Sequence, residues 1–166
     1  MKIELRELQL NEPQSVYDYF MVMPADENGL KNSAAGLSES EFAEWVKKQI
    51  DYSKGVGLPE GLVPNTFFIL FIDDVPVGNS KMRHYLTPAL ENHGGHIGYR
   101  IAPEHRGKGY ANIMLAETLK HAKAMGIEKV LLTTDADNAA SYKTIERNGG
   151  ILEKIEDGSR YYWITV

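Results

Sequence analysis

The chain has 166 residues and a mass of 18.6 kDa, a length typical of one domain with one hydrophobic core. Its 43% hydrophobic and 25% charged residues are typical of a soluble globular protein and argue against intrinsic disorder and a membrane span. The net charge of −5, without a dense Lys/Arg run, argues against nucleic acid as a partner. The chain has no cysteine, which excludes disulfides and a cysteine nucleophile. Because the first residues do not resemble a signal peptide, we expect a single cytoplasmic domain over residues 1–166.

Hydrophobic periodicity and turn residues predict the elements in the first half of the chain. We expect a strand at 3–8, helices at 12–23 and 38–52, a loop at 53–65, and a hairpin of strands at 66–72 and 77–85. Asn11 is the expected N-cap of the first helix, with Pro13 in its first turn. Ser38 and Glu41 have the spacing of a capping box at the start of the second helix.

The second half of the chain alternates strands and helices. We expect a flexible segment at 87–95, a strand at 96–102, a helix at 107–125, a strand at 129–134, a helix at 138–147 and a C-terminal pair of strands. Pro103 ends the first of these strands, and Gly126 is placed as the glycine C-cap of the long helix. The predicted order is βααβββαβαββ. A strand–helix–strand unit flanked by hairpins predicts an α/β fold with a mixed sheet.

The segment 99–111, YRIAPEHRGKGYA, has the clearest ligand-binding pattern. A strand ends there, and Gly107 and Gly109 precede the long helix. Glycines let the backbone approach a ligand closely, and the N–H groups at a helix N-terminus bind anions. Arg106 and Lys108 add positive charge. The segment fits neither a Walker A loop nor the dinucleotide fingerprint. Taken alone, it predicts either another kind of pyrophosphate site or a solvent-exposed turn with two glycines and two cations.

Three features of the chain resemble the GNAT N-acetyltransferase family. Arg106, Gly109 and Ala111 fit the acyl-CoA signature [RQ]-x-x-G-x-[GA], and Asn138 with Gly149 resembles the second cofactor segment of that family. The predicted order of elements also matches the family over nearly the whole chain. The resemblance implies a GNAT-like fold, with a mixed central sheet splayed around acetyl-CoA. It also implies an enzyme that moves the acetyl group directly to a primary amine of a small molecule or of a protein N-terminus.

The resemblance implies roles for individual residues. The pantetheine arm would lie beside the strand that contains Tyr99 and Ile101, and the backbone N–H of Ile101 would polarise the thioester carbonyl. Asn138 and Ser141 would contact the pantetheine or the nearby phosphates. The implied cofactor site consists of Tyr99, Ile101, Arg106, Gly107, Lys108, Gly109, Tyr110, Ala111, Asn138 and Ser141.

Proton transfer is the least determined part of the predicted reaction. An alkyl amine with a pKa of about 10.4 must lose a proton before attack, which costs on the order of 4–5 kcal/mol at neutral pH. Many GNAT members place a tyrosine acid seven residues after the asparagine, where this chain has Ile145. Tyr142, about one helical turn earlier, is the candidate acid, although an aromatic on an amphipathic helix is also a common core residue. His93 and His96 are the candidate bases.

Other interpretations of the same residues stay open. His93 and His96 have the spacing of a metal pair, but without cysteine and a clear third ligand we expect no metal. Ile145, in the place of the acid, also suits a non-catalytic acyl-CoA-binding module. The glycines at 107 and 109 would also suit a nucleotide as another cofactor. The acceptor is not predicted beyond an amine, and the resemblance leaves a homodimer open.

Overall fold

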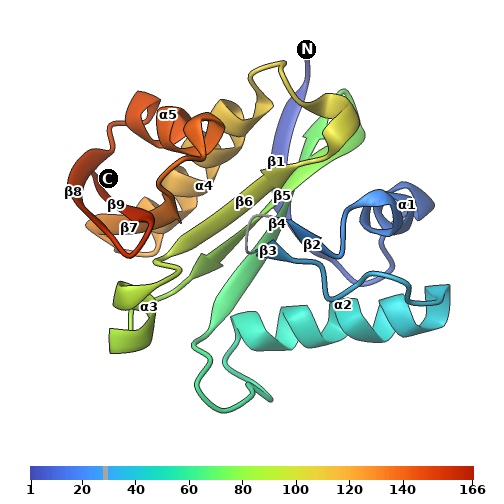
Figure 1. The fold of residues 1–166 in the computed structure, drawn as a ribbon. Helices are drawn as coiled ribbons and strands as arrows, with labels where there is room; N and C mark the ends of the chain where they lie inside the picture. Colours follow the sequence, from blue (N-terminus) through green and yellow to red (C-terminus); the bar gives the residue numbers. More distant parts are fainter. Residues whose placement is uncertain (28–29) are drawn as a thin grey trace.

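The computed structural model describes residues 1–27 and 30–166 and places two larger β-sheets side by side (Figure 1). The first sheet has the order β1-β4-β5-β6, with β1 at Ile3–Glu7, β4 at Asn65–Ile72, β5 at Val75–Arg83 and β6 at Ile97–Ile101. The second has the order β7-β9-β8, with β7 at Lys129–Asp135, β8 at Ile151–Glu156 and β9 at Ser159–Thr165. A short pair joins β2, Asp26–Glu27, to β3, Leu30–Lys31. Neighbouring strands within each sheet are antiparallel.

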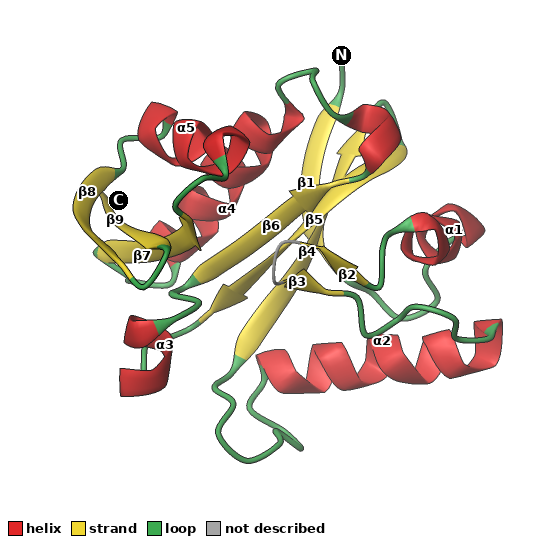
Figure 2. Cartoon of the chain, in the orientation of Figure 1, coloured by secondary structure: helices red, strands yellow, loops and turns green. Residues whose placement is uncertain are grey.

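Helices cover both faces of the first sheet (Figure 2). They are α1 at Gln14–Val22, α2 at Glu39–Ser53, α3 at Pro88–Asn92, α4 at Tyr110–Ala124 and α5 at Ala139–Arg147, with a 3-10 helix η1 at Pro103–His105. α1 and α2 pack on one face of the sheet, and α4 packs on the other. The sheet is therefore a central layer between two helical layers.

The strand β4 is apolar along its length because both of its faces are buried. Ile69 and Phe71 pack in the core cluster formed with α1 and α2. Phe68 and Leu70 point to the opposite side and pack in the clusters that contain α4 residues. A strand between two helical layers has no solvent face, so its sequence does not alternate between apolar and polar residues.

Strand register assigns the residues of β6 to the same two faces. Directly opposed side chains in antiparallel strands lie on one face of the sheet. Arg100 is opposed to Asn79, which is opposed to Ile69, so Arg100 lies on the face covered by α1 and α2. Tyr99 is opposed to Ser80, whose hydroxyl hydrogen-bonds to α4, so Tyr99 lies on the α4 face.

The structure confirms the predicted α/β fold class, and the capping box of α2 forms with both of its hydrogen bonds. The predicted N-cap of α1 is wrong. Asn11 has a φ of 61°, and the helix begins at Gln14 after Pro13, which makes no side-chain cap hydrogen bond. A left-handed residue cannot serve as a β-region N-cap, and the helix start moves to the proline instead.

Two segments near the predicted site also differ from the sequence expectation. The long helix α4 begins at Tyr110 and not at Gly107, because Gly107 and Gly109 have φ values of 77° and 81°. These left-handed angles are incompatible with a helical turn. The segment 87–95, expected to be flexible, contains α3, whose N-cap is the side chain of Thr87.

Candidate active site

A V-shaped gap lies between β6 and β7, where the two sheets meet. The vertex is held by a pair of hydrogen bonds: the His96 N–H donates to the Leu131 carbonyl at 2.8 Å, and the Leu131 N–H donates to His96 Nδ1 at 2.9 Å. A Cβ on Gly95 would collide with the Leu131 carbonyl, so glycine permits this close approach. Beyond the vertex β6 and β7 belong to separate sheets, and β6 is the edge strand of its own.

Backbone groups of β6 point into this gap. The Ala102 N–H donates to the Val77 carbonyl of β5, which fixes the phase of the antiparallel ladder. Residues of an antiparallel strand point their N–H groups alternately toward one neighbour and then the other. The N–H groups of Tyr99 and Ile101 therefore point away from β5. The edge of β6 offers hydrogen bonds to an extended ligand in the way that it would to an added strand.

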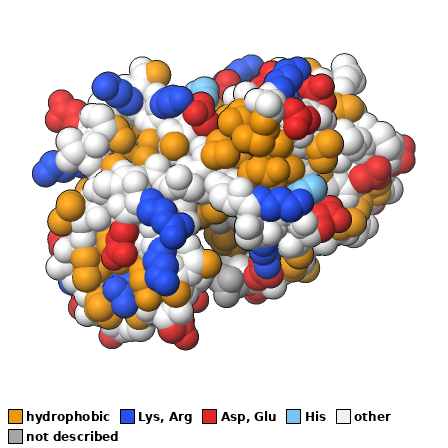
Figure 3. Space-filling model, turned by 90° about the horizontal axis from the view of Figure 1, so that it is seen from above, with side chains coloured by type: hydrophobic (Ala, Val, Ile, Leu, Met, Phe, Trp, Pro, Cys, Tyr) orange, Lys and Arg blue, Asp and Glu red, His pale blue; other side chains and the backbone are white. Residues whose placement is uncertain are grey.

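The gap is part of a cavity of about 570 Å³ lined by β6, β7, the start of α4 and α5. Seen from above, the surface is hollowed between two lobes, and basic side chains lie beside the hollow (Figure 3). Nine of the ten predicted cofactor residues line the cavity: Tyr99, Ile101, Arg106, Gly107, Gly109, Tyr110, Ala111, Asn138 and Ser141. The tenth, Lys108, is exposed and does not line it.

The start of α4 forms a cradle of backbone N–H groups. Gly109 is the N-cap residue and supplies no side-chain cap, so the first-turn N–H groups, including those of Tyr110 and Ala111, have no intrahelical acceptor. A Cβ on Gly109 would have no atom within 4 Å, so a side chain there would project into open space. This geometry suits a pyrophosphate, which the backbone approaches closely and the helix dipole stabilises.

The side chain of Arg106 turns away from this cradle. Its Nε donates to the Ile101 carbonyl at 3.0 Å, and its terminal nitrogens pair with the Glu27 carboxylate of β2. The positive charge of Arg106, which was expected beside the pyrophosphate, is therefore paired with the Glu27 carboxylate. Because Lys108 also lies outside the cavity, an anion at the start of α4 would depend on main-chain N–H groups.

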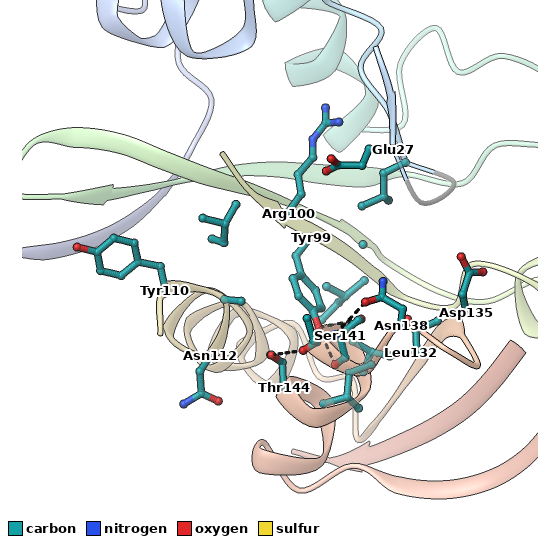
Figure 4. A pocket seen from close by; sticks show the side chains of 18 of the residues that line it. Glu27, Tyr99, Arg100, Tyr110, Asn112, Leu132, Asp135, Asn138, Ser141 and Thr144 are labelled. Carbon is teal, nitrogen blue, oxygen red and sulfur yellow. Dashed lines mark hydrogen bonds between the residues drawn. The ribbon is translucent and has the colours of Figure 1, made fainter. Parts of the chain in front are cut away.

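Tyr99 joins β6 to α5 across the gap (Figure 4). Its hydroxyl lies 3.2 Å from Ser141 Oγ, and burial raises the pKa of Tyr99 above its usual range. Asn138 is the N-cap of α5, and its side-chain oxygen accepts a hydrogen bond from the Ser141 N–H at 3.3 Å. Tyr99, Asn138 and Ser141 are thus brought together at the cavity wall.

The structure separates the three candidate proton-transfer residues. His96 lies at the vertex and does not line the cavity, and burial lowers its pKa to about 4. Tyr142 does not line the cavity either, because its ring packs under the Arg160 guanidinium at 4.1 Å. His93 alone of the three lines the cavity, from the exposed loop after α3. These positions favour His93 over His96 as the base and give no support to Tyr142 as the acid.

Several charged residues that line the cavity were not predicted from the sequence: Glu27, Arg83, Arg100, Asp135 and Arg147. Among them, Arg100 is only 8% exposed. An arginine between tyrosine and isoleucine in a buried strand was an available signal, because such a charge requires a partner. The sequence around Glu27 shows no hydrophobic periodicity, so it does not predict that Glu27 lies near β6.

The described residues contain neither a group of metal ligands nor a helix that could span a membrane. Within residues 1–27 and 30–166, no three or more His, Cys, Asp or Glu side chains are grouped so as to hold a metal ion. Among the helices of the same ranges, none combines the length and the hydrophobicity that crossing a membrane requires.

The separation of β6 from β7 and the uncapped start of α4 suit an acyltransferase type of site. The model of the acetyltransferase (GNAT) family matches residues 33–150, more than half of the chain. The chain belongs to the GNAT acetyltransferase family, and the predicted family, fold and enzyme class are confirmed. No curated protein sequence matches the chain.

Solved structures share this fold. RimL, a ribosomal L7/L12 alpha-N-protein acetyltransferase in complex with coenzyme A, has a TM-score of 0.71 and 17% identity, with 99% of this chain and 94% of that chain covered. A spermidine N-acetyltransferase SpeG chimera from Vibrio cholerae and hSSAT has a TM-score of 0.63 and 17% identity, with 99% and 96% covered. The PaiA N-acetyltransferase of Thermoplasma acidophilum, in complex with coenzyme A, has a TM-score of 0.60 and 15% identity, with both chains covered to 100%. At these identities the likeness shows the fold.

Proposed function

We propose that the chain transfers the acetyl group of acetyl-CoA directly to a primary amine of a small molecule or of a protein N-terminus. The observation that carries this proposal is the free edge of β6 beside the glycine cradle at the start of α4. The two features together suit a ligand with an extended amide-bearing arm and a pyrophosphate. RimL and PaiA, which share the fold, are described in complex with coenzyme A.

In the proposed complex, backbone N–H groups of segment 107–111 hold the pyrophosphate. The pantetheine arm lies along Tyr99 and Ile101, with Asn138 and Ser141 on the opposite wall of the cavity. This assignment uses the groups that the strand edge and the helix start leave unpaired. It gives the side chains of Arg106 and Lys108 only a minor part.

In the proposed reaction the amine nitrogen attacks the thioester carbonyl, a C–N bond forms, and the C–S bond breaks. CoA leaves as a thiolate, and the amine proton passes to water or to a base. The Ile101 N–H stabilises the oxyanion that develops during attack. His93 is the predicted base that reaches the cavity, and its exposed position favours proton transfer through water. No side-chain acid is assigned, because Ile145 is buried where many family members have tyrosine.

A second candidate function is a non-catalytic acyl-CoA-binding module, favoured by Ile145 in the place of an acid. A thiol-release assay with acetyl-CoA and a panel of amines separates the two functions. The enzyme is expected to release CoA above the hydrolysis background with at least one amine. Binding of CoA without such release would contradict the enzyme and favour the module. The cytoplasmic location and the homodimer stay predictions.

A further inference from the structure

Arg100 is a buried cation in the cavity wall with little to compensate its charge. Its side chain is only 8% exposed and lines the cavity. Its Nε donates to Asn79 Oδ1 at 3.3 Å and its Nη1 to the Pro24 carbonyl at 3.5 Å, both longer than usual for N–H···O bonds. In the described part of the chain, Nη2 has no hydrogen-bond acceptor. Nor does a carboxylate there come within 4.0 Å of the guanidinium.

The neighbours of Arg100 do not neutralise it. Asn79 Oδ1, its nearest acceptor, also accepts a hydrogen bond of 2.7 Å from the Tyr19 hydroxyl. Burial raises the pKa of Tyr19, so this residue is a neutral phenol and not a counterion. A buried charge without a partner is costly, and such a charge at a ligand cavity is often completed by the ligand.

The acidic side chain beside Arg100 in the cavity wall is already paired. Glu27 lies near Arg100 in the close-up (Figure 4), but its carboxylate is engaged with Arg106. Two guanidinium groups thus surround a single carboxylate, which leaves one positive charge in excess. Occupation of this region by an anion would balance the charge.

Arg100 also lies on the face of β6 opposite to that of Tyr99, which is one of the proposed cofactor residues. Tyr99 points toward Ser141 and α5, whereas Arg100 points the opposite way, toward Pro24 and the side where Glu27 lies (Figure 4). Arg100 directly precedes Ile101, whose N–H is the proposed donor to the reacting carbonyl, and both residues line the cavity. An anion bound there would therefore belong to the acceptor and not to the phosphates of CoA.

We propose that Arg100 binds a carboxylate of the acceptor, so that the substrate is an amine that also carries a carboxylate, as an amino acid does. The inference rests on the proposed function. The planar guanidinium offers paired N–H donors that match the two oxygens of a carboxylate. A polyamine would instead bring further positive charge next to Arg100 and Arg106.

The first experiment compares amino acids with their C-terminal amides and with spermidine in the thiol-release assay. The expected result is a kcat/KM at least tenfold higher for an amino acid than for its amide, with spermidine poorer still. An amide lowers the pKa of the neighbouring amine and so favours the reactive free base. A preference for the carboxylate consequently has to come from its recognition by the protein.

The second experiment tests whether Arg100 causes the preference. R100Q keeps a long polar side chain without the charge, and we expect its kcat/KM for the amino acid to fall at least tenfold and its kcat/KM for the amide to change less than threefold. R100K, which keeps the charge, is expected to retain part of the preference. R147Q is the matched control, because Arg147 lines the same cavity from α5, and the carboxylate-to-amide ratio should not change.

The outcomes separate this inference from the proposed function. If no amine releases CoA, the proposed function fails. If amides or spermidine react as well as the carboxylates, the enzyme stands and the inference is overturned. A carboxylate preference that survives in R100Q also overturns the assignment to Arg100. If R100Q does not fold, the wild-type comparison and R100K still decide between these outcomes.

Discussion

His96 at the vertex of the gap should make the stability of the protein depend on pH. Its Nδ1 accepts the hydrogen bond from the Leu131 N–H, so the proton of the neutral ring is on Nε2. Protonation of Nδ1 would break this bond and leave a buried backbone N–H without a partner. Burial, assisted by the positive charge of Arg83, lowers the pKa of His96 from 6.5 to about 4.

The size of the effect follows from this difference in pKa. Between pH 6.5 and about 4 the unfolded chain binds a proton at His96 that the folded protein does not bind. Acid therefore favours unfolding, and the stability contribution present above pH 6.5 is lost as the pH falls toward 4. The full loss is about 3 kcal/mol, of which about 2 kcal/mol falls between pH 7 and pH 5.

The substitution His96→Asn isolates this contribution. Asparagine does not titrate, and its side-chain oxygen is placed to accept the Leu131 N–H in place of Nδ1. Urea unfolding of both proteins at pH 7 and pH 5 is the measurement. The wild type should lose about 2 kcal/mol more than H96N over this interval, because other titrating groups, including His84, are common to both. An equal loss in the two proteins would refute the role of His96.

Two further predictions test the capping box at the start of α2 and the role of Tyr142. Ser38→Ala removes the cap of the Glu41 N–H and should lower the free energy of unfolding by about 1 kcal/mol in urea unfolding; an effect below about 0.3 kcal/mol would contradict the capping box. Tyr142→Phe should leave kcat and its pH profile unchanged within twofold in the thiol-release assay, because the hydroxyl is outside the cavity. A tenfold loss of kcat would restore Tyr142 as the acid.

Local sequence signals predict most of the helices and strands, because caps, turns and hydrophobic periodicity depend on residues that are close in the sequence. The capping box at Ser38 and the apolar stripe of α4 depend on neighbours within a few turns, and both form as predicted. The start of α4 was placed three residues too early at Gly107. The same glycines that signal a ligand site also adopt left-handed angles, which delay the helix to Tyr110.

The side chains of the site were less predictable because they depend on contacts that are distant in the sequence. His96 resembled a base until the structure placed it against Leu131, 35 residues away. The signature predicts Arg106 as a phosphate ligand, but its side chain reaches Glu27, 79 residues away. Arg100 stands out as a charge in a buried strand, but no local pattern shows that the residues around it provide no acidic partner.

The most direct measurement of the central proposal is calorimetric titration of CoA into the wild type, Gly109→Glu and Gly158→Glu. Gly109 and Gly158 both have left-handed φ values, of 81° and 77°, and a Cβ on either has no atom within 4 Å. Strain of about 1–3 kcal/mol is therefore common to both variants, while only G109E places a negative charge in the cradle. We expect one CoA per chain in the wild type and in G158E, and no binding in a folded G109E. Unchanged affinity in G109E would contradict the placement of the cofactor between β6 and β7.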